Sequence, residues 1–150
     1  LGFACTSVDV SEGRGRGHTR WRRSPASQAD ADEEPSSDAS PPGVAEHGVT
    51  AAARAHANDR AEWDLIAHYG ADVSNLWDRV KRAGYNAKLA AENVGTGQVS
   101  FTEVLKGWQE SPGHNKNLLQ AEAQHMGIAL VQDPKTEFKT FWTLDVGAPR

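Results

Sequence analysis

The stretch Ala91-Glu92-Asn93-Val94, followed by Trp108-Gln109-Glu110-Ser111-Pro112-Gly113-His114, carries the most information about the fold of this chain. It places a carboxylate, a helix, a tight turn and an imidazole in a fixed order. A second imidazole, His68, precedes them in Ala67-His68-Tyr69-Gly70. Neutral imidazoles and carboxylates suit a divalent metal such as Zn²⁺, and they can also bind a polar ligand or relay a proton. We therefore expect folding to gather these side chains at one cleft.

The composition limits the class of protein. The chain has 150 residues, which fits one domain, and 38% of them are hydrophobic. Its 16 basic and 20 acidic residues give a net charge of −4, whereas a protein that binds nucleic acid usually presents a basic face. No apolar run approaches the roughly 20 residues that a membrane-spanning helix needs. The sequence therefore predicts neither a nucleic-acid partner nor a transmembrane span.

The N-terminal residues Leu1-Gly2-Phe3-Ala4-Cys5 contain the only cysteine, so an internal disulfide is excluded. Cys5 is either the lipid-acceptor residue at the end of an apolar leader, which would anchor the protein, or an ordinary thiol. The small Ala4 favours the lipid acceptor, whereas Gly2 stands where a larger aliphatic residue is usual. Both interpretations stay open.

Residues 1–43 are predicted to be a disordered tether or the remnant of a signal or lipoprotein leader. They contain a basic patch around residues 14–23, an acidic patch around residues 30–34 and a segment rich in Ser and Pro. Such a composition cannot bury enough apolar surface to offset the backbone entropy that folding removes. We assign residues 44–150 to the folded domain.

Four helices are predicted within this domain. Thr50 is expected to cap a helix that runs to about residue 66, and Ser74 to cap a second that ends near Ala83. Ser100 and Glu103 predict a capping box at the start of a third helix. Ser111 followed by Pro112 is typical of a helix start, which places His114 in the first turn of a short fourth helix whose Leu118 and Leu119 point to the core.

Residues 126–131 and 140–146 alternate or cluster apolar residues around the turn-forming Asp133-Pro134-Lys135-Thr136, which predicts an antiparallel hairpin. Glu92 is expected in a turn, with Asn93 fixing the loop behind it. Helices followed by strands indicate an α+β fold. The tryptophans expected in its core are Trp63, Trp77, Trp108 and Trp142.

The order of several short motifs resembles a bacterial CAP domain, the group of cysteine-rich secretory proteins, antigen 5 and pathogenesis-related 1 proteins. The motifs span about two-thirds of the chain. They are Ala53-Arg54-Ala55-His56-Ala57, Ala67-His68, residues 78–85, Ala91-Glu92-Asn93-Val94, Trp108, Ser111-Pro112-Gly113-His114, residues 117–119, Met126-Gly127-Ile128-Ala129 and Phe141-Trp142-Thr143.

The resemblance implies a three-layer α-β-α sandwich with an antiparallel sheet and a central cleft. It implies that His68, Glu92 and His114 lie in that cleft, with Glu110 as the candidate for a second acidic position. Family members usually begin with a further helix, and residues 1–49 contain no counterpart to it. The domain is therefore expected to lack that first helix, or to have an altered N-terminal region.

Three functions are compatible with these residues. The first, which we favour, is an extracytoplasmic, secreted or envelope-anchored module that binds a small-molecule, lipid or cell-envelope ligand without catalysis, with Zn²⁺ or another divalent metal held by His68 and His114. The second is a metal-assisted, peptidase-like hydrolase that uses Glu92 as the base. The third is a lipid or sterol binder. No His-Glu-x-x-His or Gly-x-Ser-x-Gly motif is present.

Overall fold

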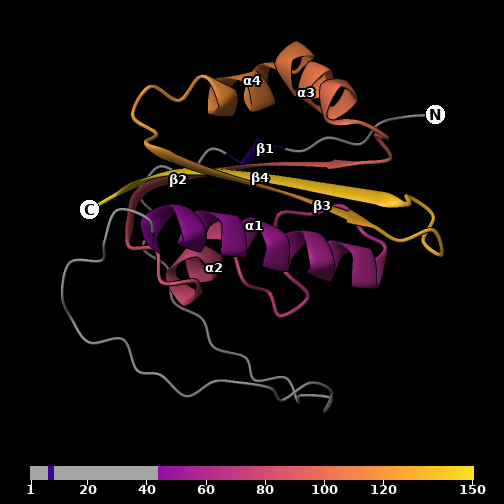
Figure 1. Ribbon diagram of the computed structural model, residues 1–150, viewed down its shortest axis with the longest axis horizontal. Helices are drawn as coiled ribbons and strands as arrows, with labels where there is room; N and C mark the ends of the chain where they lie inside the picture. The colour runs from indigo at the N-terminus through magenta and orange to yellow at the C-terminus, as the bar shows by residue number, and fades with distance from the viewer. Residues whose placement is uncertain (1–6, 9–43) are drawn as a thin grey trace.

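A computed structural model describes residues 7–8 and 44–150, which form three layers. Helices α1 (Val44–Trp63) and α2 (Leu76–Arg82) cover one face of an antiparallel sheet, and α3 (Phe101–Glu110) and α4 (Pro112–Leu118) cover the other (Figure 1). The predicted α-β-α sandwich is confirmed. The predictions for Cys5 and the tether fall on residues 1–6 and 9–43, outside the described residues.

The sheet contains β1 (Ser7–Val8), β2 (Ala87–Thr96), β3 (His125–Gln132) and β4 (Thr140–Pro149), in the order β1-β2-β4-β3. All neighbouring strands are antiparallel, and the β3–β4 hairpin confirms the pairing predicted from the sequence. The prediction of a turn at Glu92 is wrong, because Glu92 lies in the middle of β2. That strand is buried on both faces over most of its length, so its sequence shows no alternation of polar and apolar residues.

Helix α1 begins at Val44, six residues before the predicted cap at Thr50, and ends at Trp63. Its buried face is formed by Val49, Ala53, His56 and Arg60, which recur at the spacing of three to four residues expected of a helix. The helix lies directly on β3, because a Cβ atom at Gly127 would come within 2.5 Å of the Thr50 backbone. A polar histidine thus occupies the centre of the helix face that packs on the sheet.

Local capping signals define the other helices. Asn75, rather than the predicted Ser74, caps α2 and forms a capping box with Asp78. Ser100 caps α3 as predicted, by accepting from the Glu103 amide at 3.2 Å. The Glu103 carboxylate reaches back to the amide of Val99, one residue before the expected partner.

The core divides between the two faces of the sheet. Leu76, Val80 and Tyr85 pack on the α1 face, whereas Trp108 and Trp142 pack beneath α3 and α4. The predictions for Trp108 and Trp142 are confirmed. The core prediction was wrong for two side chains that are largely exposed: Trp63 at the end of α1 and Leu119 after α4.

Candidate functional site

Strand β2 places two neighbouring polar side chains on opposite faces of the sheet. Glu92 faces α1 and α2, whereas Asn93 faces α4, since successive residues of a strand alternate in direction. Both side chains are almost fully buried, at 1% exposure each. A buried charge and a buried amide each require polar partners, and each face supplies them.

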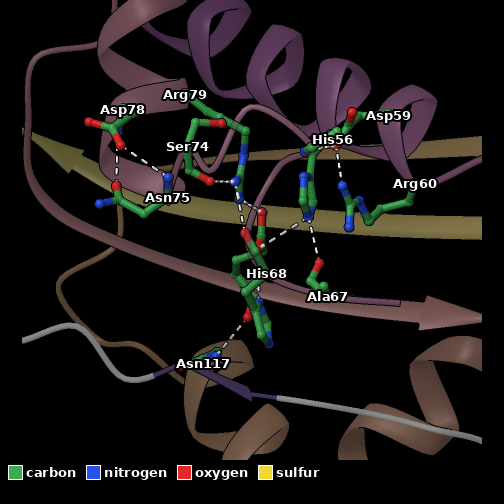
Figure 2. A network of polar contacts seen from close by, with 12 residues as sticks. His56, Asp59, Arg60, Ala67, His68, Ser74, Asn75, Asp78, Arg79 and Asn117 are labelled. Atoms are coloured by element: carbon green, nitrogen blue, oxygen red, sulfur yellow. Dashed lines mark hydrogen bonds and ion pairs between the residues drawn. The ribbon is translucent and has the colours of Figure 1, made fainter. Parts of the chain in front are cut away.

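The Glu92 carboxylate is bound by side chains from two different segments. Its Oε1 atom lies 2.9 Å from Nδ1 of His68, and its Oε2 atom forms an ion pair with the Arg79 guanidinium. Nε2 of His56, from the centre of α1, lies 3.7 Å from Oε1. Figure 2 shows His56, His68 and Arg79 converging on this network. Both oxygens of Glu92 are therefore engaged.

Arg79 also holds the segment that carries His68. Its Nη1 donates to the backbone carbonyl of His68 at 2.8 Å and to that of Ser74 at 3.1 Å (Figure 2). One guanidinium thus fixes both the carboxylate and the loop backbone, which is possible because its five N–H donors form a rigid planar fork. The structure brings His68 and Glu92 together, as the sequence predicted.

Glu92 is ionised despite its burial. Burial acts to raise its pKa, but the hydrogen bond from His68 and the charge of Arg79 outweigh that effect and lower the pKa below its usual range. Because the carboxylate accepts, the proton of His68 that points at Glu92 resides on Nδ1. This arrangement fixes the orientation of the His68 ring, whose side chain is 11% exposed.

His56 is a neutral imidazole. Burial lowers its pKa and outweighs the opposing effect of Glu92. Its Nε2 atom donates to the Ala67 carbonyl at 2.8 Å, which leaves Nδ1 as an acceptor. The sequence analysis left His56 as structural or solvent-facing. The clue was its central place in an alanine-rich helix, where it falls on the buried face.

Asp145 is a second carboxyl group that the sequence analysis missed. It lies on β4 directly opposite Glu92, is fully buried, and neither of its oxygens has a hydrogen-bond partner among the described residues. Burial, followed by the negative charge of Glu92, raises its pKa well above its usual range. The folded environment therefore favours the protonated form of Asp145. Its signal in the sequence was a carboxyl group on the inward face of an otherwise apolar strand.

His114 belongs to the opposite layer of the sandwich. Proline at the first helical position starts α4, and the His114 ring pairs with Ser111 Oγ through Nδ1 at 2.7 Å. Its carbonyl accepts from Asn93 at 3.1 Å, and Asn117 bonds Asn93 Oδ1 at 2.9 Å. Amide contacts thus hold the backbone of His114 against β2. The contacts described for its ring run to its own helix, whereas those of His68 run to Glu92.

Two further candidates do not join the cluster. The Glu110 side chain is 67% exposed and lies 3.8 Å from Lys106, one helical turn earlier. Cys5 lies outside the described residues. Within residues 7–8 and 44–150, no group of three or more His, Cys, Asp or Glu side chains is arranged to hold a metal ion. In that same part of the chain, no helix has the length and apolar character to cross a membrane.

The comparison with known families identifies the chain. Residues 17–146 match the CAP, or cysteine-rich secretory protein, family. Because the match extends over most of the sequence, the chain belongs to that family.

Two curated proteins of Bacillus subtilis (strain 168) are similar to the chain. The uncharacterized protein YkwD is 32% identical over 84 residues, which cover 56% of this chain and 33% of YkwD. The uncharacterized membrane protein YlbC is 28% identical over 75 residues, which cover 50% of this chain and 22% of YlbC. The chain thus matches a third or less of the length of these relatives.

Solved structures share the fold. An extracellular protein containing a SCP domain from Bacillus anthracis str. Ames matches with a TM-score of 0.58 and 25% identity over 67% of this chain and 32% of its own. An outer surface protein from Borrelia burgdorferi matches with a TM-score of 0.62 and 16% identity, covering 69% of this chain and 74% of its own. The sandwich is therefore the CAP fold. The candidate site is the polar cluster on its α1 face, formed by His56, His68, Arg79 and Glu92.

Proposed function

We propose that this CAP domain is a non-enzymatic, extracytoplasmic module that binds a polar ligand at the partly exposed side chain of His68. The observation that carries the proposal is the fixed pair of His68 and Glu92, with the imidazole at the border of the solvent and the carboxylate behind it. A buried carboxylate that orients a partly exposed imidazole is an arrangement suited to recognition. The structural relatives, one described as extracellular and one as an outer surface protein, support the location.

The state of Glu92 argues against the hydrolase. A general base must reach the proton that it removes, and its pKa is best placed near the working pH. Both oxygens of Glu92 are engaged, and the lowered pKa makes the carboxylate a weak base. Glu92 is thus better suited to orienting His68 than to activating water.

A divalent metal remains part of this proposal. Zn²⁺ would be held by His68 and His114, whose Nδ1 atoms contact Glu92 and Ser111 respectively. Because α4 lies on the opposite face of the sheet from Glu92, the two rings would have to meet in a shared space to hold one ion. A carboxylate that accepts from the far nitrogen of a metal-binding imidazole is a common supporting contact. The metal would supply a positive charge to an anionic ligand. Glu110 is not included in this set, because it is exposed on α3 and pairs with Lys106.

Calorimetric titration of the full chain with Zn²⁺ tests the metal, with the His68→Ala/His114→Ala double variant as the control. Saturable binding that the double variant loses is the expected result, and equal heats for both proteins would remove the metal from the proposal. Incubation with a peptide library tests the absence of catalysis. Turnover by the wild-type chain that disappears in a folded Glu92→Gln variant would establish the hydrolase instead.

A further inference from the structure

Strand β3 forms one edge of the sheet, and no strand within residues 7–8 and 44–150 pairs with its outer side (Figure 1). Its sequence contains no Lys, Arg, Asp, Glu or Pro, and its register with β4 is unbroken. Proteins commonly protect an exposed sheet edge with charges, prolines or bulges, because its unpaired N–H and C=O groups attract another strand. Strand β3 has none of these three protections.

The backbone groups at the even-numbered positions of β3 point away from the sheet. The Asp133 amide donates to the Lys139 carbonyl at 2.9 Å, at the position that continues the pairing of β3 with β4. Every second residue of an antiparallel strand bonds to its partner strand, so the odd-numbered residues of β3 bond to β4. Met126, Ile128 and Leu130 therefore direct their N–H and C=O groups outward.

The side chains of Met126, Ile128 and Leu130 form an apolar strip on the α3 side of the sheet. Gly127 lies against α1, because a Cβ atom there would meet the Thr50 backbone. Side chains alternate between the two faces of a strand, so the strip faces away from α1. Met126 is 54% exposed and Leu130 is 40% exposed, whereas Ile128 packs against the core beneath α3. The same positions thus combine outward backbone groups with exposed apolar side chains.

The apolar strip is complementary to a second copy of itself. A two-fold axis at Ile128, perpendicular to the sheet, sets two β3 strands antiparallel, with Met126 of one copy opposite Leu130 of the other. All of these positions have outward backbone groups, so the opposed residues form hydrogen-bonded pairs. Opposed side chains lie on the same face of the joined sheet, so the two strips contact each other. No like charges meet along β3, since it contains no Lys, Arg, Asp or Glu.

The open edge favours a second β3 over other partners. Outward N–H and C=O groups require an extended backbone, whereas the backbone groups of a helix bond within the helix. A flexible peptide would lose backbone entropy on becoming a strand. Strand β3 is already held extended by β4 and α1, so a second copy binds without that loss.

We infer that β3 is a self-association surface through which two copies of this chain pair edge to edge and join their sheets. An edge of 8 residues is about 26 Å long, and such a contact buries on the order of 300–500 Å² per copy. This area is at the small end of specific interfaces, so the dimer is weak and reversible. The inference goes beyond the function proposed for His68 and does not depend on it.

Analytical ultracentrifugation of the full chain, from about 10 µM to about 1 mM, tests the association. The expected result is a reversible approach to the dimer mass, with a Kd on the order of 100 µM. Met126→Lys should weaken the dimer by about tenfold, because each dimer contains the change twice. Leu65→Lys is the matched control, since Leu65 is 53% exposed on the loop after α1, and it should associate like the wild type.

A pair of opposite charges tests the register. Leu130→Glu alone should weaken the dimer, whereas Met126→Lys/Leu130→Glu should regain most of the lost affinity, because opposite charges then face each other twice across the axis. Hydrogen exchange supplies a second readout. The amides of Met126, Ile128 and Leu130 should be protected only at concentrations that favour the dimer. The Ala129 amide bonds within the sheet and should be protected at all concentrations.

Three results would overturn the inference: a monomer throughout the concentration range, equal weakening by Leu65→Lys and Met126→Lys, or a double variant that associates no better than its single variants. Circular dichroism checks that each variant is folded, and hydrogen exchange of the wild type tests the edge without any variant. Because these readouts need neither metal, ligand nor turnover, their failure is distinguishable from failure of the function proposed for His68.

Discussion

Glu92 and Asn93 are neighbours on one strand, yet they are stabilised in different ways. On the α1 face, a full negative charge is balanced by Arg79 and oriented against His68. On the α4 face, Asn93 and Asn117 form neutral amide contacts with each other and with the carbonyl of His114. Ionic contacts are sensitive to pH and to the loss of one partner, whereas amide contacts are not ionisable. The same sheet thus supports one charged face and one neutral face.

The largest effect is expected from Arg79→Met. This change removes the charge that balances Glu92 and also the donors to the His68 and Ser74 carbonyls. Removing one partner of the buried Arg79–Glu92 ion pair should lower the free energy of unfolding by about 3–5 kcal/mol. Chemical denaturation measures this free energy. A loss below about 1 kcal/mol, as for an exposed pair, would show that Glu92 is solvated.

A smaller effect is expected on the neutral face from Asn117→Leu. The change removes donors to the Glu92 carbonyl at 3.2 Å and to Asn93 Oδ1, and it leaves buried acceptors without a partner. The expected loss is about 1–3 kcal/mol. This loss of unfolding free energy should stay constant between about pH 5 and pH 8, because amide groups do not titrate. The loss caused by Arg79→Met should vary with pH, because it leaves the Glu92 carboxylate without its partner. A marked pH dependence in denaturation curves would contradict the contrast between the two faces.

Asp145, on the same face as Glu92, should make the free energy of unfolding depend on pH. Its folded pKa is raised, so both states are protonated below the usual range for aspartate. As the pH rises through that range, the unfolded chain loses the proton while the folded chain keeps it, and stability falls. Asp145→Asn should remove this slope, and Asp145→Val should stabilise the fold by about 1–2 kcal/mol near pH 7. Unchanged slopes in denaturation series at several pH values would show that Asp145 is ionised in the fold.

The smallest effect on stability is expected from His68→Ala. The ring is partly exposed and its Nδ1 contacts Glu92, and the loss of that hydrogen bond should cost about 0.5–1.5 kcal/mol. Thermal unfolding measures it, with Lys106→Ala as an exposed control. A loss as large as that of Arg79→Met would indicate that His68 is structural rather than presented for recognition.

The sequence predicted those parts of the fold whose signals are local. Ser100 and Pro112 mark helix starts, and the apolar runs around Asp133 mark the hairpin. Strand β2 was missed because it is buried on both faces and contains a glycine, so it shows no alternation. The register of α1 was missed because alanine tolerates buried and exposed positions equally.

The candidate site was partly predictable for a similar reason. The family resemblance selected His68 and Glu92, and the structure joins them. Arg79, His56 and Asp145 were not selected, because their roles depend on contacts between distant segments. Only the pairing of β2 with β4 places Asp145 opposite Glu92, and no local pattern records that register.

A double-mutant cycle of Arg79→Met and Glu92→Leu tests most directly whether Glu92 is a buried anion held by Arg79. Each single variant leaves one uncompensated buried charge, and each should lose about 3–5 kcal/mol in chemical denaturation. The double variant leaves neither charge, and it should be more stable than the less stable single variant. If the loss in the double variant equals the sum of the two single losses to within about 0.5 kcal/mol, the two residues act independently and the account is contradicted.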